Sequence, residues 1–326
     1  MDKASYSFDL NDYHWKDHLR KAGYAVIKNV ASTEEIKVAI HLLERDLASL
    51  NLPSHGLLAK LAQSEGAWKV RGIPKVKEAF SKIWDSEDLI VSMDAIISWR
   101  LWKGYDPSIS NQNLPLKPRT EGLHLDQNPF DKPYLDCVQG MIPLLPVTTE
   151  TGGLQVVPFS HLDDNKNIFK NRYPSMKGKG DWCLLSIDDP LYNDAVLLLA
   201  EPGDLILWDS RTVHGGRVGT GHVSVNEPSA TDKTHITCDA QNIGESEKSI
   251  NDASRIPFVR LSVCVAMTPR SKASDEVLKA RKDGFEKGIS FNHCPHEAGT
   301  STGTIKDRLP EKCQLPVLSK WQQHLL

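Results

Sequence analysis

The chain has 326 residues, of which 40% are hydrophobic and 25% are charged. This composition excludes a disordered or fibrous chain and predicts a globular protein with an ample core. The 39 Lys and Arg residues nearly balance the 42 Asp and Glu residues, and the net charge is -3. Because such a chain has no general field that attracts polyanions, we expect neither a nucleic-acid nor a membrane partner.

The six cysteines are scattered along the chain and form no closely spaced pair, which is typical of a reducing compartment. The first residues are acidic and aromatic and do not resemble a secretory signal, and no apolar run approaches membrane-spanning length. We therefore expect a cytoplasmic protein, a monomer or weak homo-oligomer, with a single domain over residues 1–326.

Residues 1–93 are predicted to form a helical flank with the first strand. The run "GYAVIKNV" at residues 23–30 is short and β-prone, which favours a strand. It is followed by Ser32 and, three residues later, Glu35, a capping-box pattern before apolar residues at helical spacing. A second helix is expected around "VKEAFSKIW", within residues 70–90.

Residues 94–270 contain short β-prone runs separated by turn residues. These runs are "AIISWRLW", "DCVQGMIPLL", "GGLQVVPF", "WCLLSI", "AVLLLA", "DLILWD" and "VRLSVCVAM". They predict a mixed α+β, mainly β fold with a double-stranded β-helix core, that is, a cupin-like jelly roll flanked by N-terminal helices. The polar stretch 217–257 is expected to be a lid-like insertion. Residues 271–326 are expected to form a C-terminal helix and tail.

A histidine and an aspartate lie two positions apart in "GLHLDQNPF", as His124 and Asp126. Alternate residues of a strand point to the same side, so both could reach one cation. A second pair of this kind, His161 and Asp163, is also present, as expected for a motif short enough to occur by chance. Neither pair alone predicts a metal site.

A third candidate ligand is His214, in "PGDLILWDSRTVHGG". Two histidines and one carboxylate on one face of a metal ion leave adjacent positions open, which is the arrangement of non-haem Fe(II) oxygenases. A zinc site for hydrolysis would use the same ligand types and remains an alternative. A weaker candidate for a second metal site is the stretch with His293, Cys294 and His296.

Three blocks of sequence together resemble the phytanoyl-CoA dioxygenase-like branch of the Fe(II)/2-oxoglutarate-dependent oxygenases. They are "GLHLDQNPF", "VQGMIPLLPVTTETGGLQVVPFSH" and "PGDLILWDSRTVHGG". The resemblance implies catalytic metal ligands at His124, Asp126 and His214, with Fe(II), 2-oxoglutarate and O2 as cofactor and cosubstrates. It also implies a structural role for His161. Two positions depart from the pattern: Phe159 replaces a customary glycine, and Val225 stands where a 2-oxoglutarate arginine is usual.

The cosubstrate dicarboxylate requires a bidentate cation, which favours arginine. In "VRLSVCVAM" the alternation of a strand places Arg260, Ser262 and Cys264 on one side. We therefore expect Arg260 and Ser262 to bind 2-oxoglutarate, with Arg217 as the second choice. Gln139 is a weaker candidate near the cosubstrate.

Cations and amides close to the motifs suggest a substrate site. Arg119, Asn128, Arg211 and Arg217 are the candidates, and they favour a small anionic substrate such as a carboxylated metabolite.

The resemblance implies oxidation of an unactivated C–H bond coupled to conversion of 2-oxoglutarate to succinate, by hydroxylation, desaturation or cyclisation. Alternatives are a kainoid-synthase-like cyclase of an amino-acid precursor, an acyl-CoA hydroxylase, and a catalytically silent jelly-roll binding protein.

Overall fold

Two β-sheets form the centre of the protein in the computed structural model, which describes residues 3–48, 50, 55–102, 117–221, 256–297, 299 and 308–326. The larger, eight-stranded sheet has the order β1 (Ser7–Phe8), β2 (Tyr24–Ile27), β11 (Leu205–Asp209), β7 (Val138–Pro143), β13 (Phe258–Pro269), β5 (Ile96–Arg100) and β3 (Leu57–Leu58), with β4 (Leu89–Val91) also paired to β13. The five-stranded sheet has the order β10 (Val196–Leu197), β8 (Gly152–Val156), β12 (His214–Val218), β6 (His124–Leu125) and β9 (Cys183–Leu184). Apart from the parallel pair β1 and β2, the strand pairs are antiparallel. The expected mainly β jelly roll is confirmed.

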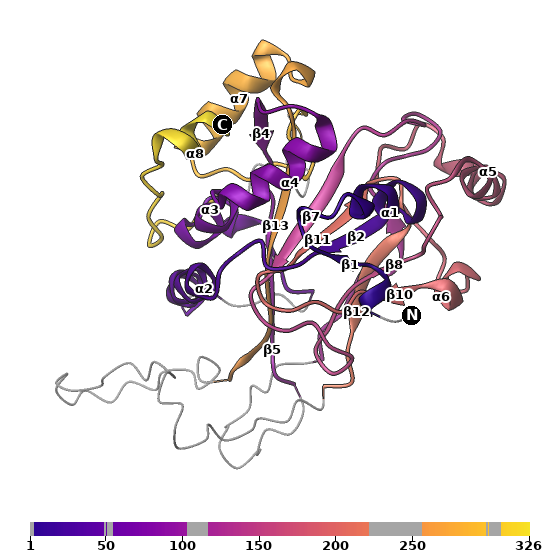
Figure 1. Cartoon of the computed structure of the whole chain (residues 1–326), viewed down its shortest axis with the longest axis horizontal. Helices are drawn as coiled ribbons and strands as arrows, with labels where there is room; N and C mark the ends of the chain where they lie inside the picture. The colour runs from indigo at the N-terminus through magenta and orange to yellow at the C-terminus, as the bar shows by residue number, and fades with distance from the viewer. Residues whose placement is uncertain are drawn as a thin grey trace.

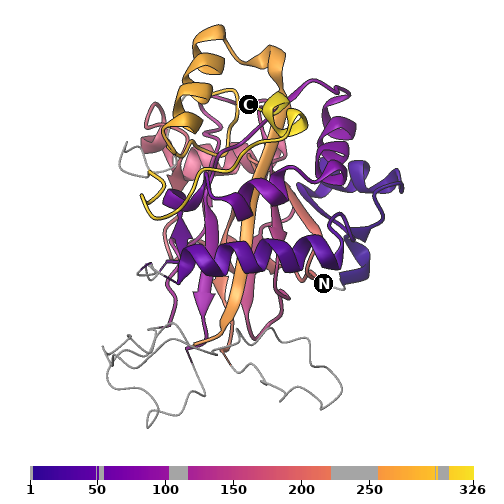
Figure 2. The same cartoon turned by 90° about the vertical axis from the view of Figure 1, so that its left-hand side faces the viewer.

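Helices cover the outer face of the larger sheet (Figure 1). The described helices are α1 (His14–Ala22), α2 (Thr33–Leu47), α3 (Glu65–Arg71), α4 (Pro74–Trp84), α5 (Asp163–Arg172), α6 (Leu191–Asp194), α7 (Asp275–Glu286) and α8 (Lys320–His324). Figure 2 shows α2 crossing this face in front of the strands. No helix among the described residues has the length and apolar character needed to cross a bilayer.

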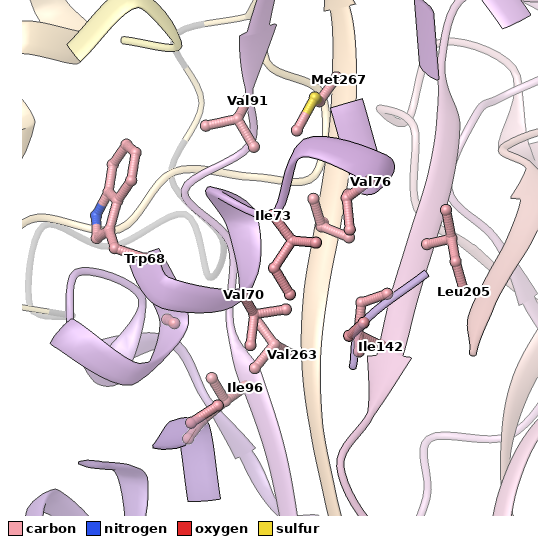
Figure 3. Packing of buried hydrophobic residues seen from close by; sticks show 14 of the residues in the cluster. Trp68, Val70, Ile73, Val76, Val91, Ile96, Ile142, Leu205, Val263 and Met267 are labelled. Atoms are coloured by element: carbon pink, nitrogen blue, oxygen red, sulfur yellow. The ribbon is translucent and has the colours of Figure 1, made fainter. Parts of the chain in front are cut away.

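The strand β13 separates the hydrophobic core from the space between the sheets. Leu261, Val263 and Val265 belong to the core cluster that includes the helix residues Val70, Ile73 and Val76. Figure 3 shows Val263 beside Val70 and Ile73. The alternate residues Arg260 and Cys264 instead line a cavity on the other side. The alternation expected from the sequence is therefore present.

Local signals in the sequence correctly indicated several elements. Helix α2 begins after Ser32, and the reciprocal hydrogen bonds of a Ser32–Glu35 capping box are present. Helix α4 and strand β2 also form where they were expected. Helix α5 was not expected, because its sequence is largely polar and only Lys166 and Phe169 are buried. Of the expected insertion at 217–257, residues 222–255 lie outside the described part of the chain.

The turn after β8 accounts for the second histidine–aspartate pair. Phe159 has φ 65°, in the left-handed region that glycine favours, and its side chain is 48% exposed. The turn therefore keeps a glycine-type conformation despite the larger residue. His161 is buried, and its Nε2 lies 2.9 Å from the backbone oxygen of Arg20, while Asp163 forms an ion pair with Lys166. The His161 contact joins the turn to α1, and the Asp163–Lys166 pair lies within the first turn of α5.

Ionic contacts hold the loop after α7 against the start of β7. Asp136, Cys294, His296 and Glu297 offer ligand-type atoms within 4.8 Å of one another, whereas His293 is not in this group. Nε2 of His296 lies 3.2 Å from both carboxylate oxygens of Asp136. Lys272 also binds Asp136, and Lys132 binds Glu297. Because these lysines already neutralise the two carboxylates, the group is balanced without a metal ion.

The Asp136–His296 contact predicts a pH-dependent stability. Although burial alone would lower it, the hydrogen bond to Asp136 raises the pKa of His296 from 6.5 to about 9. A raised histidine pKa stabilises the fold below pH 6.5, and this contribution is lost as the pH rises to about 9. We expect the melting temperature of the wild type to fall more between these pH values than that of His296→Gln, measured by differential scanning fluorimetry. Equal losses in both proteins would contradict the assigned contact.

Candidate metal and cosubstrate site

A cavity of about 660 Å³ lies between the two sheets. From the larger sheet its wall includes Ile97, Trp99, Gln139, Met141, Trp208, Arg260 and Cys264. From the smaller sheet it includes His124, Leu154, His214, Gly215 and Gly216, and Asp126 follows β6 directly. The three candidate metal ligands and the candidate cosubstrate arginine thus face one space.

The pairing of β12 with β6 brings the two histidines together. His214 is the direct partner of His124 in the antiparallel register, and their ring centroids are 4.5 Å apart. Nε2 of His214 lies 3.2 Å from Oδ2 of Asp126, and Nε2 of His124 lies 3.7 Å from Oδ1 of Asp126. Atoms bound to one ion at about 2.1 Å are separated by about 3.0–3.4 Å when the angles are near 90–110°. The three side chains are therefore close to the arrangement of ligands around a single ion.

Backbone carbonyl oxygens fix the orientation of both imidazoles. Nδ1 of His124 lies 3.0 Å from the oxygen of Gly122, and Nδ1 of His214 lies 2.8 Å from the oxygen of Thr212. A carbonyl oxygen only accepts, so each Nδ1 carries a hydrogen, and in the neutral ring each Nε2 is left with a lone pair that a metal ion could accept. Metal-binding histidines are commonly oriented in this way.

The charge states of His124 and Asp126 also suit a divalent cation. Burial lowers the pKa of His124, and the neighbouring His214 lowers it further. Burial alone would raise the pKa of Asp126, but His124, His293 and His214 together hold it well below its usual range. Gln139 donates from Nε2 to Oδ2 of Asp126 at 3.0 Å. The result is an ionised, oriented carboxylate beside the imidazole of His124, whose charged form is disfavoured.

Arg260 is a buried cation on the opposite wall. It is 4% exposed, and its guanidinium lies 4.3 Å from the centroid of the Trp99 ring. Burial lowers its pKa to about 10, so it stays charged at neutral pH. Its Nε has no hydrogen-bond partner, and among the described residues no carboxylate forms an ion pair with it. A buried charge without a counter-charge is costly, which suits a site for an anionic ligand.

The other candidate residues occupy different places. Ser262 is buried and its hydroxyl has no partner among the described residues, but it is not among the residues lining the cavity. Arg217 and Arg119 are exposed and lie outside the lining. Both remain predictions as substrate contacts.

Arg211 and Asn128 are engaged in local contacts. Nη2 of Arg211 lies 2.7 Å from Oδ2 of Asp209. Asn128 is fully buried, and its Nδ2 donates to the backbone oxygens of Met176 and Gly180. Neither residue lines the cavity, so their proposed contacts with substrate are not supported by their positions.

Several lining residues lay outside the sequence-based set. Trp182, directly before β9, is 49% exposed and its ring centroid is 6.1 Å from that of His124. Asp94, Asp181 and His293 also line the cavity. For Trp182 a signal existed, since a tryptophan preceded a β-prone run. Asp94 had no motif, and His293 was named only as part of a possible second metal site, because the fold and not the local sequence brings their loops to this cavity.

Comparisons with known proteins show what the chain is similar to. The family model for phytanoyl-CoA dioxygenase matches residues 19–221. A curated relative, "Ava biosynthesis cluster protein O" of Aspergillus versicolor, is 23% identical over 337 residues, covering 91% of each chain.

Among solved structures, the epimerase SnoN in complex with Fe3+, alpha ketoglutarate and nogalamycin RO is 16% identical, with a TM-score of 0.47 over 78% of this chain and 81% of that one. EvdO2 from Micromonospora carbonacea var. aurantiaca, complexed with 2-oxoglutarate, is 16% identical, with a TM-score of 0.42 over 79% and 91% of the chains. Because the family model covers well over half of the sequence, the chain belongs to the phytanoyl-CoA dioxygenase family and is an Fe(II)- and 2-oxoglutarate-dependent enzyme.

Proposed function

We propose that the enzyme oxidises an unactivated C–H bond of a small molecule in the cavity between the sheets, while 2-oxoglutarate is converted to succinate. His124, Asp126 and His214 would bind Fe(II), and Arg260 would bind the far carboxylate of 2-oxoglutarate. The observation that carries this proposal is the buried, uncompensated Arg260 on the same cavity as three ligand-type side chains. Bound there, the metal and the cosubstrate supply the oxidising power.

The residues around Arg260 favour a carboxylate as its partner. The Trp99 ring supports one face of the guanidinium, and Sδ of Met141 lies 3.8 Å from Nη2. Neither group removes the positive charge, and Nε of Arg260 has no hydrogen-bond partner, so the guanidinium can still bind an anion. Gly216 lies nearby, and a Cβ built there would be 4.0 Å from Nη1 of Arg260 but only 2.8 Å from Cγ2 of Thr120, so the glycine leaves room for Thr120.

The remaining wall residues would position the substrate and keep water out. Leu154, Met141 and Trp208 provide apolar surface around the ligand atoms. Asp126 retains the carboxylate whose loss accompanies halogenation in related enzymes, so we propose oxygenation or dehydrogenation of the substrate and not halogenation. Hydroxylation is the first expectation, and desaturation or ring closure are the alternatives.

Replacing Arg260 tests the cosubstrate site. We expect Arg260→Ala to weaken 2-oxoglutarate binding by about 10- to 100-fold, because a charge-assisted pair of hydrogen bonds is lost. Isothermal titration calorimetry under anaerobic conditions with Fe(II) would measure this. Arg217→Ala is the matched control and should bind normally; if Arg217→Ala lost binding and Arg260→Ala did not, the assignment would be reversed.

Replacing one carboxylate of each histidine–aspartate pair tests the metal site. Asp126→Asn should lose Fe(II) binding in equilibrium dialysis, because the anionic ligand is removed. Asp163→Asn changes the second pair in the same way and should bind iron normally, since Asp163 is paired with Lys166 outside the cavity. Normal iron binding by Asp126→Asn would exclude the proposed ligand set.

The nature of the reaction can be followed by mass spectrometry. The enzyme would be incubated with iron, 2-oxoglutarate and candidate small molecules. A substrate should gain an oxygen atom on hydroxylation, or lose two hydrogen atoms on desaturation or ring closure. Succinate should form in an amount equal to the oxidised product. Succinate formation should require intact His124, Asp126 and His214. Substrate oxidation that continues without 2-oxoglutarate would rule out the proposed coupling.

A further inference from the structure

We propose that Gln139 is a positioning residue of the metal site, which holds one carboxylate oxygen of Asp126 so that the metal binds only the other. This inference rests on the proposed function and deepens the description of its metal site. It differs from the contact with 2-oxoglutarate that the sequence suggested for Gln139.

The carboxylate ligand lies just beyond the strand that carries its neighbouring histidine. Strand β6 consists of His124 and Leu125, which pair with residues of β12 and β9, and Asp126 follows it directly. Both ligand histidines lie in paired strands, and the Nδ1 atom of each is held by a backbone oxygen. No described strand residue pairs with Asp126, so another group must orient its side chain.

Gln139 provides this orientation from the opposite sheet. Its Nε2 lies 3.0 Å from Oδ2 of Asp126, and its side chain is buried. A carboxylate that binds a metal is ionised and only accepts, so the amide nitrogen is the atom that faces it. In the larger sheet Gln139 pairs with Trp208 of β11 on one side and with Ala266 of β13 on the other. Its position is therefore fixed by the centre of that sheet.

The other close neighbours of the carboxylate cannot replace this hydrogen bond once a metal is bound. They are the two imidazoles: Nε2 of His214 lies 3.2 Å from Oδ2, and Nε2 of His124 lies 3.7 Å from Oδ1. An Nε2 atom that binds a metal uses its lone pair for the metal and carries no hydrogen. Gln139 is then the remaining donor to Asp126 among the described side chains, and it reaches Oδ2 and not Oδ1.

This asymmetry determines how many oxygens of Asp126 bind the metal. With Oδ2 held by the amide of Gln139, Oδ1 is the oxygen left for the metal. Two imidazoles and a single carboxylate oxygen leave adjacent coordination positions open. Binding through both oxygens would occupy a further position, which the cosubstrates would otherwise use. Gln139 therefore preserves the open positions on which the proposed reaction depends.

Gln139→Met tests this role, because it removes the amide and keeps a side chain of similar length. The matched control is Gln155→Met. Gln155 is also a buried glutamine, but its Nε2 donates to the backbone oxygen of Gly216, and it does not line the cavity. The melting temperatures of the metal-free variants would show that both fold. If Gln139→Met does not fold, Gln139→Asn, whose amide is one carbon farther from Asp126, takes its place.

Two anaerobic binding measurements separate the positioning role from a contact with 2-oxoglutarate. Equilibrium dialysis with Fe(II) alone should show about 10- to 100-fold weaker binding by Gln139→Met, because the carboxylate ligand has lost its orienting partner. Gln155→Met should bind Fe(II) normally. Calorimetry at saturating Fe(II) should show that Gln139→Met still binds 2-oxoglutarate like the wild type. Normal Fe(II) affinity together with weaker 2-oxoglutarate binding would overturn the proposal and return Gln139 to the cosubstrate.

Infrared difference spectra between the Fe(II)-loaded and metal-free proteins report how the carboxylate binds. The antisymmetric and symmetric carboxylate stretches are farther apart when one oxygen binds a metal than when both do. The wild type and Gln155→Met should show the larger separation, and Gln139→Met the smaller one. An unchanged separation in Gln139→Met would also overturn the proposal. Absence of Fe(II) binding by the wild type would instead contradict the proposed function, so the two failures are distinguishable.

Discussion

The antiparallel register between β6 and β12 is the constraint on which the site depends. It places His214 directly opposite His124, although they are ninety positions apart in the sequence. A shift of this register by one residue would turn one imidazole to the other face of the sheet. The same pairing extends through β12 to β8, which closes the wall of the cavity with Leu154 and the two glycines after His214. The position of the histidines is thus a property of the whole smaller sheet.

The larger sheet contributes the positively charged group of the site, Arg260. Through β13 it combines a hydrophobic face, packed under the helices, with a face that carries Arg260 into the cavity. The surrounding core keeps β13 in place, and the burial of Arg260 makes an anionic partner favourable. Two sheets therefore bring a carboxylate with two imidazoles and an unpaired guanidinium to the same space. This separation of roles explains how one cavity could hold both a metal and a dicarboxylate.

Site residues could be predicted from the sequence where their chemical type and the local periodicity indicate the same role. The ligand candidates His124, Asp126 and His214 could be named because their residue types and motif context are specific, and the alternation around Arg260 follows from strand geometry alone. Residues placed by loops could not be found in this way. Asn128 and Arg211 looked suitable by type, yet their hydrogen bonds are used locally. Asp94 and His293 reach the cavity only through long-range packing, which periodicity does not encode.

A crystal structure of the protein grown anaerobically with Fe(II) and 2-oxoglutarate would test the central claim most directly. We predict one iron at about 2.0–2.2 Å from Nε2 of His124, Nε2 of His214 and a carboxylate oxygen of Asp126, with the far carboxylate of 2-oxoglutarate on Arg260. Iron bound instead by Asp136, Cys294 and His296, or 2-oxoglutarate bound away from Arg260, would contradict it.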